Sequence, residues 1–343
     1  MVRWVRSRLR KHWATAALLV FAALTFPLLT PSNAQANLLC FFRIKRCQGQ
    51  LGQAPNRQGG GLRTGRARGG SQSDIPYVIS PRNTWLESDR FTIRWHPVSG
   101  ATRYTVRLWR WSDERDMLDW LVWQTTVNET QVLYPGQIAL QRGRYYVVEV
   151  LADTGVASCL DEGFDQAGFE LIFPEDSAIL AADLDRLDQQ ALPPEEHVLN
   201  LASLYLREDL IAAAVDVLEP LTANDANNPV IYEALGDLYS YAGLNSLSAQ
   251  HYQKAWDIST VRSDLLGQAI ALNGLAEVNV ALGQWDNAIR RFIQAESLFR
   301  ALDSQAPQVA DIQRRIKALE HAQASEYAPP VPQNFCELSQ AAL

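Results

Sequence analysis

Two segments of the chain carry the same pattern of large and small apolar residues 34 positions apart, and a third copy follows 40 positions later. In each copy the apolar residues recur at helical spacing on two consecutive segments, which predicts three helix–turn–helix units. The matched positions are Val198, Leu201, Ala202, Tyr205, Ala214 and Leu218, then Tyr232, Leu235, Gly236, Tyr239, Ser248 and Tyr252, and then Leu272, Leu275, Ala276, Asn279, Ala288 and Phe292. A unit of this size cannot bury its apolar face alone, so the pattern predicts stacked units with an extended binding surface.

These units resemble tetratricopeptide repeats. Leu235-Gly236 followed by Tyr239 matches the first helix of that family, and Ala288 followed by Phe292 matches the second. Ser248 stands where the family has alanine. The small residues let two helices touch while the large ones fill the groove beside them. An ordinary helical bundle is the alternative. The resemblance implies repeats over about 195–228, 229–262 and 269–302, with a capping helix over 308–323.

In tetratricopeptide repeats the first helix of each unit lines a concave face, where partners bind. The inner positions carried over to this chain are Leu199, Ser203, Arg207, Glu233, Asp237, Tyr241, Asn273 and Glu277. Carboxylate and amide groups beside an aromatic ring indicate a groove for a basic or polar extended peptide. The alternative is that contacts lie on the convex side. We expect the six extra residues before the third unit to lengthen its first helix.

The region from residue 75 to 173 shows short runs with alternating apolar residues, separated by turn signals. Such runs predict an antiparallel sandwich. The region resembles the fibronectin type III fold at Trp95, Tyr104, Val106, Leu140, Gly143, Tyr146, Val148 and Val150. In that family the tyrosine hydroxyl ties a loop corner to the backbone. The resemblance implies a fold and no chemistry.

Together these patterns predict a multidomain chain, all-β and then all-α. An immunoglobulin- or fibronectin III-like β-sandwich over 74–174 precedes a short tetratricopeptide α-solenoid over 175–325 and a Pro-containing tail over 326–343. Before the repeats, Leu180, Leu184 and Leu187 form one apolar helical stripe. Asp183 falls off that stripe and is expected to face water.

The first 36 residues have the layout of a secretory signal peptide. Five basic residues precede an apolar run over 14–29, and Ala34-Gln35-Ala36 offers a cleavage site. The run is shorter than the roughly 20 residues that a spanning helix needs. The alternative is an anchor that is never cut. We expect an exported protein without a stable transmembrane anchor after cleavage, in a bacterial periplasm or at a cell surface.

A basic segment precedes an acidic body. Residues 37–73 contain seven Arg or Lys and no acid, and their Gly, Gln and Arg content predicts a disordered linker. When this segment and the five charges of the first 36 residues are subtracted from the total of −7, a net charge of −19 remains for 74–343. Contact with anionic lipid, with cell-wall polymer or with the acidic body, and a plain tether, all remain open. The export signal argues against nucleic acid as a partner.

Four cysteines follow the signal, and an exported chain can form disulfides. Cys40 and Cys47 enclose a short loop and are the candidate pair, and Cys159 with Cys336 is a second pairing. Free thiols are the alternative, since spacing does not decide connectivity.

Four tryptophans fall on two neighbouring strands of the β region: Trp109, Trp111, Trp120 and Trp123. Trp109 and Trp111 share one face, because strand side chains alternate. Two interpretations are open. The indoles either pack under neighbouring structure or form an exposed aromatic platform for sugar rings or a protein. The acidic loop that begins at Asp161 lacks the regular spacing of a calcium loop, and we expect it to be solvated.

No motif for catalysis, metal binding or a cofactor stands out. The five histidines are scattered, and the chain has neither a phosphate-binding Gly loop with Lys-Ser/Thr nor a Gly-x-Ser-x-Gly elbow. We therefore expect a non-enzymatic adaptor that binds a protein or peptide, without cofactor or metal. A carbohydrate or cell-wall binding module that uses the tryptophans is one alternative, and a cryptic hydrolase is another.

Overall fold

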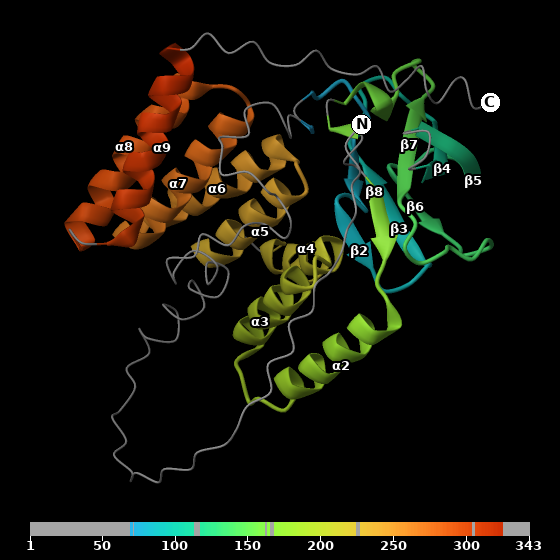
Figure 1. The fold of residues 1–343 in the computed structure, drawn as a ribbon, viewed down its shortest axis with the longest axis horizontal. Coiled ribbons are helices and arrows are strands. Elements are labelled where there is room, and N and C mark those ends of the chain that lie inside the picture. The colour runs from blue at the N-terminus through green and yellow to red at the C-terminus, as the bar shows by residue number, and fades with distance from the viewer. Residues whose placement is uncertain are drawn as a thin grey trace.

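The computed structural model describes residues 69–70, 72–112, 117–161, 163–164, 168–223, 227–303 and 306–324 (Figure 1). The predicted signal peptide, the Cys40–Cys47 pair, the tail and the linker up to residue 68 lie outside the described residues. A β region is followed by an α region, which confirms the coarse layout that the sequence predicts. None of the helices in the described part is long and apolar enough to cross a membrane.

Two sheets make up the β region. One has the strand order β1–β3–β6 and the other the order β2–β8–β7–β4–β5. Neighbouring strands are antiparallel except β2 and β8, which are parallel. The strands are β1 (Val78–Ser80), β2 (Thr84–Leu86), β3 (Phe91–Trp95), β4 (Tyr104–Ser112), β5 (Met117–Val127), β6 (Gln131–Tyr134), β7 (Tyr146–Ala152) and β8 (Gly168–Leu171).

The two sheets share one apolar core. Ile93 and Trp95 of β3 meet Tyr104, Val106 and Leu108 of β4 there, and all five are buried. The Trp95 and Tyr104 rings meet edge to face at 5.5 Å. The burial of alternate residues on β4 confirms the face that the alternation predicts.

A hydrogen bond closes the corner before β7. The Tyr146 hydroxyl accepts the backbone N–H of Gln141 at 2.8 Å. Gly143 lies between them with a φ of 71°, a conformation that side chains disfavour. The tie between this hydroxyl and the backbone is the one that the Leu-x-x-Gly-x-x-Tyr run predicts.

The α region runs from residue 174 to 324. Its helices are α2 (Pro174–Asp188), α3 (Pro194–Arg207), α4 (Ile211–Leu218), α5 (Pro229–Tyr241), α6 (Asn245–Val261), α7 (Leu265–Ala281), α8 (Trp285–Leu302) and α9 (Pro307–Ala324). Proline opens α2, α3, α5 and α9, where its missing N–H costs nothing. Gly243 and Gly283 follow α5 and α7 with positive φ, which lets the next helix turn back. At 17 residues α7 exceeds the 13 of α5, as the inserted residues predict.

Two glycines admit one tyrosine between α5 and α7. A Cβ added at Gly236 would lie 2.9 Å from the Tyr252 ring, and one at Gly274 would lie 2.3 Å from it. Tyr252, on α6, is 4% exposed and donates its hydroxyl to the Asp237 carboxylate on α5. The ring therefore fills the space that the small residues leave, as the repeat pattern predicts for Gly236.

The β region and the helices share a second core. Ile75 and Tyr77, just before β1, pack in one buried cluster with Leu235, Leu238 and Leu244 of the α5 region. The β region lies beside α4 and α5 in Figure 1. The two regions are therefore joined by apolar packing as well as by the chain.

A buried arginine links three parts of the chain at this junction. The Arg82 side chain donates to the carbonyls of Ala242 at 2.9 Å and Gly163 at 3.2 Å, and pairs with Asp161 at 2.9 Å. The side chains of Arg82 and Asp161 are 2% and 4% exposed. The other Asp161 oxygen accepts the Gly70 N–H at 2.8 Å. The prediction that Asp161 lies in a solvated loop is wrong, because a buried guanidinium requires its charge.

Asp183 also departs from its sequence-based prediction. It is 9% exposed and pairs with Arg186 of α2 and Arg207 of α3. Asp183 lies outside the apolar stripe, as expected, but Arg207 of α3 packs against it and pairs with its carboxylate. The expectation that Asp183 faces water is therefore wrong.

His251 gives the stability a dependence on pH. Its ring stacks on Tyr239 at 5.2 Å and on Tyr232 at 6.1 Å, and burial lowers the pKa of His251. The unfolded chain therefore takes up this proton at a higher pH, so stability is lost as pH falls below about 6.5.

We expect His251→Gln to reduce the loss of stability between about pH 7.5 and 5.5. Urea unfolding at both pH values measures the difference between wild type and variant. Some slope should remain, since burial also lowers the pKa of His96. Identical slopes in wild type and variant would contradict the assignment to His251.

Candidate functional site

Two of the predicted first helices, α5 and α7, lie next to one another. Helix α5 packs against α7 as well as against α6. An ion pair between Arg315 and Glu277 joins α9 to α7 in the same way. We call the side formed by α5, α7 and α9 the inner row.

The structure divides the eight predicted groove residues by exposure. Arg207 is exposed, and four residues are half-buried: Asp237, Tyr241, Asn273 and Glu277. The other three are buried at 3–4% exposure: Leu199, Ser203 and Glu233. The prediction that all eight are accessible lining residues is therefore wrong for these three.

The reasons for burial differ. Leu199 belongs to the apolar core that α3 shares with α4 and α5. The Ser203 hydroxyl turns back to the Leu199 carbonyl at 2.9 Å. Glu233 lies one turn before Asp237 on α5, and its side chain is buried within the helical stack.

Ion pairs neutralise part of the charge around the inner row. Arg207 pairs with Asp183 and with Glu208. Arg315 pairs with Glu277, and with Asp311 at 3.0 Å. Sequence reasoning missed Arg315, since a residue of the terminal helix carries no repeat signal that places it beside α7.

Asp237 takes part in none of these ion pairs. Its carboxylate accepts the Tyr252 hydroxyl, and among the described residues it forms no ion pair. Together with Asn273 and Glu277 it offers oxygen acceptors on two adjacent helices. Such a surface suits peptide N–H groups and cationic side chains.

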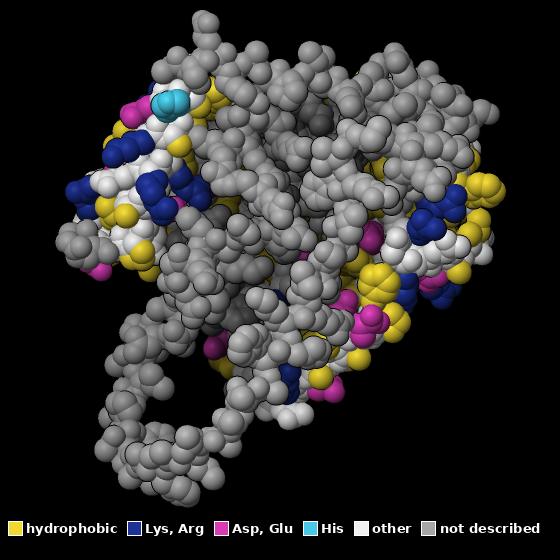
Figure 2. Space-filling view, viewed as in Figure 1, with side chains coloured by type: hydrophobic (Ala, Val, Ile, Leu, Met, Phe, Trp, Pro, Cys, Tyr) yellow, Lys and Arg dark blue, Asp and Glu magenta, His cyan; other side chains and the backbone are white. Residues whose placement is uncertain are grey.

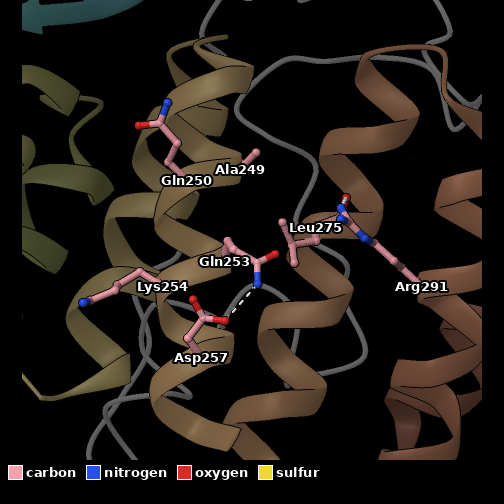
Figure 3. A pocket seen from close by; sticks show the side chains of 7 residues that line it. All are labelled: Ala249, Gln250, Gln253, Lys254, Asp257, Leu275 and Arg291. Atoms are coloured by element: carbon pink, nitrogen blue, oxygen red, sulfur yellow. Dashed lines mark hydrogen bonds between the residues drawn. The ribbon is translucent and has the colours of Figure 1, made fainter.

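A different surface lies between α6, α7 and α8, on the other side of the predicted repeats. An open pocket of about 460 Å³ is lined by Ala249, Gln250, Gln253, Lys254, Asp257, Leu275 and Arg291 (Figure 3). Gln253 donates to Asp257 at 3.0 Å, and Arg291 donates to the Asn279 side chain at 2.7 Å. Burial lowers the pKa of Arg291. This mixed-charge pocket is the alternative to the inner row as a binding surface.

The tryptophans do not form one exposed platform. Trp109 is fully buried in a cluster with Cys159 and Phe164, and its indole N–H donates to Glu149 at 3.0 Å. Trp111 packs partly buried against the same cluster, which the interpretation as packing under neighbouring structure predicts.

The other two tryptophans lie apart from this cluster. Trp123 packs on Tyr134 at 5.4 Å, beside the sheet core. Trp120 is 60% exposed, with Arg110 over its ring at 5.8 Å. Only Trp120 of the four is strongly exposed, so the platform prediction is wrong.

Cys159 is part of a disulfide. The remaining cysteines of the chain lie outside the described residues, so the predicted pairings stay predictions. In the described part of the chain, no three His, Cys, Asp or Glu side chains gather as a metal site.

Charge is unevenly spread over the face in Figure 2. Lys and Arg side chains lie over α8 and α9 and over the β region, whereas several acidic side chains lie over α2.

Comparisons with known proteins add little. No protein-family model matches the chain, and no curated protein matches it. The crystal structure of BtubC (BKLC) from P. vanneervenii is similar at a TM-score of 0.35 and 20% identity, over 44% of this chain and 68% of that chain. A likeness this weak carries no argument about fold or function.

Proposed function

We propose that this protein is a non-enzymatic, exported adaptor that binds an extended basic or polar peptide along the inner row. One observation carries the proposal: Asp237, Asn273 and Glu277 keep exposed surface on the adjacent helices α5 and α7. Tyr241 adds an aromatic ring at the end of α5. A short peptide gains affinity from such a row when its own polar groups find acceptors.

We also propose the finer architecture that the sequence suggests. The strand orders and the Tyr146 corner support a fibronectin III-like sandwich, from which the parallel β2–β8 pair departs. The paired helices and the Gly236–Tyr252 contact support a tetratricopeptide-like solenoid. A solenoid of this kind gives the inner row the curvature that wraps an extended ligand.

Rigid packing favours a preformed site. Tyr252 is held between two helices by glycines on both, and its hydroxyl fixes the Asp237 carboxylate. Arg315 fixes Glu277 from α9. Acceptors held in place lose little entropy when a ligand binds, which raises affinity for a given number of contacts.

Asp237→Asn is expected to weaken binding of a basic peptide by about tenfold, because it removes the inner-row charge that no described cation balances. Fluorescence anisotropy with a labelled Arg-Gly-Ser repeat peptide measures the change. Amide and carboxylate have the same shape, so the Tyr252 hydroxyl keeps an acceptor.

Asp257→Asn is the matched control, since it removes the same charge from the pocket between α6 and α8. It should leave the affinity unchanged. A loss at Asp257 with none at Asp237 would place the ligand on the outer surface. If a Glu-Gly-Ser repeat peptide binds as tightly as the Arg-Gly-Ser peptide, the inner row does not select ligands by positive charge.

A further inference from the structure

Arg291 brings a positive charge without a counter-ion to the pocket between α6, α7 and α8. Its Nη1 atom donates to the Asn279 side chain at 2.7 Å and to the Leu275 carbonyl at 3.5 Å. Among the described residues these are its only hydrogen bonds, and no carboxylate there pairs with it. Burial lowers the pKa of Arg291, a shift that an adjacent carboxylate reverses. A half-buried guanidinium is therefore held by neutral oxygens alone.

The packing of the predicted repeats does not require this cation. Asn279 and Arg291 follow Tyr239 and His251 by 40 positions, which is the offset between the second and third units. In the second unit the Tyr239 and His251 rings stack at 5.2 Å. In the third unit a hydrogen bond between Asn279 and Arg291 takes the place of that stack. Asn279 also donates to Gln284 at 2.6 Å, so its own amide is held in place. Asn279 thereby fixes one edge of the guanidinium.

The other edge of the guanidinium is open to a ligand. In the part of the chain that the structure describes, Nε and Nη2 of Arg291 donate to no protein acceptor. These two atoms carry parallel N–H groups in one plane, which is the fork that binds both oxygens of a carboxylate. Figure 3 shows Arg291 extending from α8 toward Leu275, with Gln253 extending toward Leu275 from α6. The fork therefore lies beside apolar surface and a neutral amide.

The remaining lining favours a small organic acid over an inorganic anion. Leu275 and Ala249 supply apolar surface, and a volume of about 460 Å³ lies within the range of small-molecule sites. Lys254 adds positive charge at the exposed rim. Asp257 is the one carboxylate among the described lining residues, and it repels a ligand that carries a second negative charge. A singly charged carboxylate with a short alkyl chain fits both the fork and the apolar lining.

We propose that the pocket between α6, α7 and α8 binds a small monocarboxylate. The two carboxylate oxygens accept the N–H groups of Nε and Nη2 of Arg291, and the alkyl chain lies on Leu275 and Ala249. This site is separate from the inner row, so the inference goes beyond the proposed function and does not depend on it. The helices then carry two binding surfaces of opposite preference, one for a cationic peptide and one for an acid.

The test titrates hexanoate against the full chain and measures the Kd by ligand-observed NMR. Arg291→Gln should raise this Kd about tenfold, because an amide has no charge and lacks the two-donor fork. Arg290→Gln is the matched control: Arg290 is exposed on α8, bonds to Asn287 and does not line the pocket. It should leave the Kd unchanged. Hexanamide, which has the same shape without the charge, should bind wild type about tenfold more weakly than hexanoate.

A second variant leaves Arg291 and its contacts in place. Asp257→Asn removes the negative charge from the pocket and keeps an acceptor for the Gln253 amide. It should lower the Kd for hexanoate about threefold, since an exposed charge contributes a modest amount. An unchanged or higher Kd contradicts the proposal, and this result stands even if Arg291→Gln fails to fold.

The other outcomes are equally decisive. No binding of hexanoate by wild type, or the same Kd in wild type and Arg291→Gln, overturns the site. Equal weakening by Arg290→Gln and Arg291→Gln reduces the effect to net charge and also overturns it. If inorganic phosphate binds as tightly as hexanoate, the assignment to an organic carboxylate is wrong. None of these results bears on the inner row, whose basic peptide should bind Arg291→Gln as it binds wild type.

Discussion

Asp161→Ala is expected to lower the free energy of unfolding by about 3–5 kcal/mol, because it leaves a buried cation without its counter-charge. Arg82 is 2% exposed and keeps only backbone carbonyls as partners after the change. The same substitution removes the acceptor of the Gly70 N–H. Urea unfolding followed by far-UV circular dichroism measures the loss.

A double variant separates the stranded charge from lost packing. Arg82→Met combined with Asp161→Ala removes both charges and should be more stable than Asp161→Ala alone, since no isolated ion stays buried. If the double variant is the less stable one, the cost comes from the carbonyl contacts of Arg82 and not from its charge.

Gly274→Ala is expected to destabilise the helices by about 1–3 kcal/mol through overpacking. The added Cβ would lie 2.3 Å from a carbon of the Tyr252 ring, and α5 with Gly236 closes the other side of that ring. Alanine gains about 1 kcal/mol of helix propensity over glycine, so a net loss requires the steric effect to dominate. Thermal unfolding and urea unfolding both measure this change in stability.

The Tyr252→Leu background is the control for this clash. A smaller side chain leaves space for the Cβ, so Gly274→Ala should there be neutral or stabilising by up to about 1 kcal/mol. A gain in stability in the wild-type background would show that the two helices can separate at no cost.

The periodicity of apolar residues predicted which side chains of each strand or helix are buried, but not which other part of the chain covers them. Alternation on β4 correctly predicted that Val106 and Leu108 enter the sheet core. It also put Trp109 on the opposite face, yet only the structure shows the cluster with Phe164 that covers it. The strand or helix that carries a residue determines which way its side chain points. The segment that packs over that side chain lies far away in the sequence.

The same limit applies to charges. Asp161 and Asp183 look solvated in the sequence because carboxylates are seldom buried without partners. Their partners Arg82 and Arg207 lie 79 and 24 positions away and have no spacing rule that connects them. The inner row was predictable to the extent that it follows the repeat, which places Asp237 and Glu277 but not Arg315.

The core that Ile75 and Tyr77 share with α5 bears on the order in which the protein can finish folding. Leu235 follows Tyr77 by 158 positions, so a growing chain completes the whole β region long before this partner exists. Domains tend to fold from the N-terminus as they are synthesised. Until α5 has been synthesised, Ile75 and Tyr77 stay exposed to water at the edge of the completed sheet. A chaperone can bind them there.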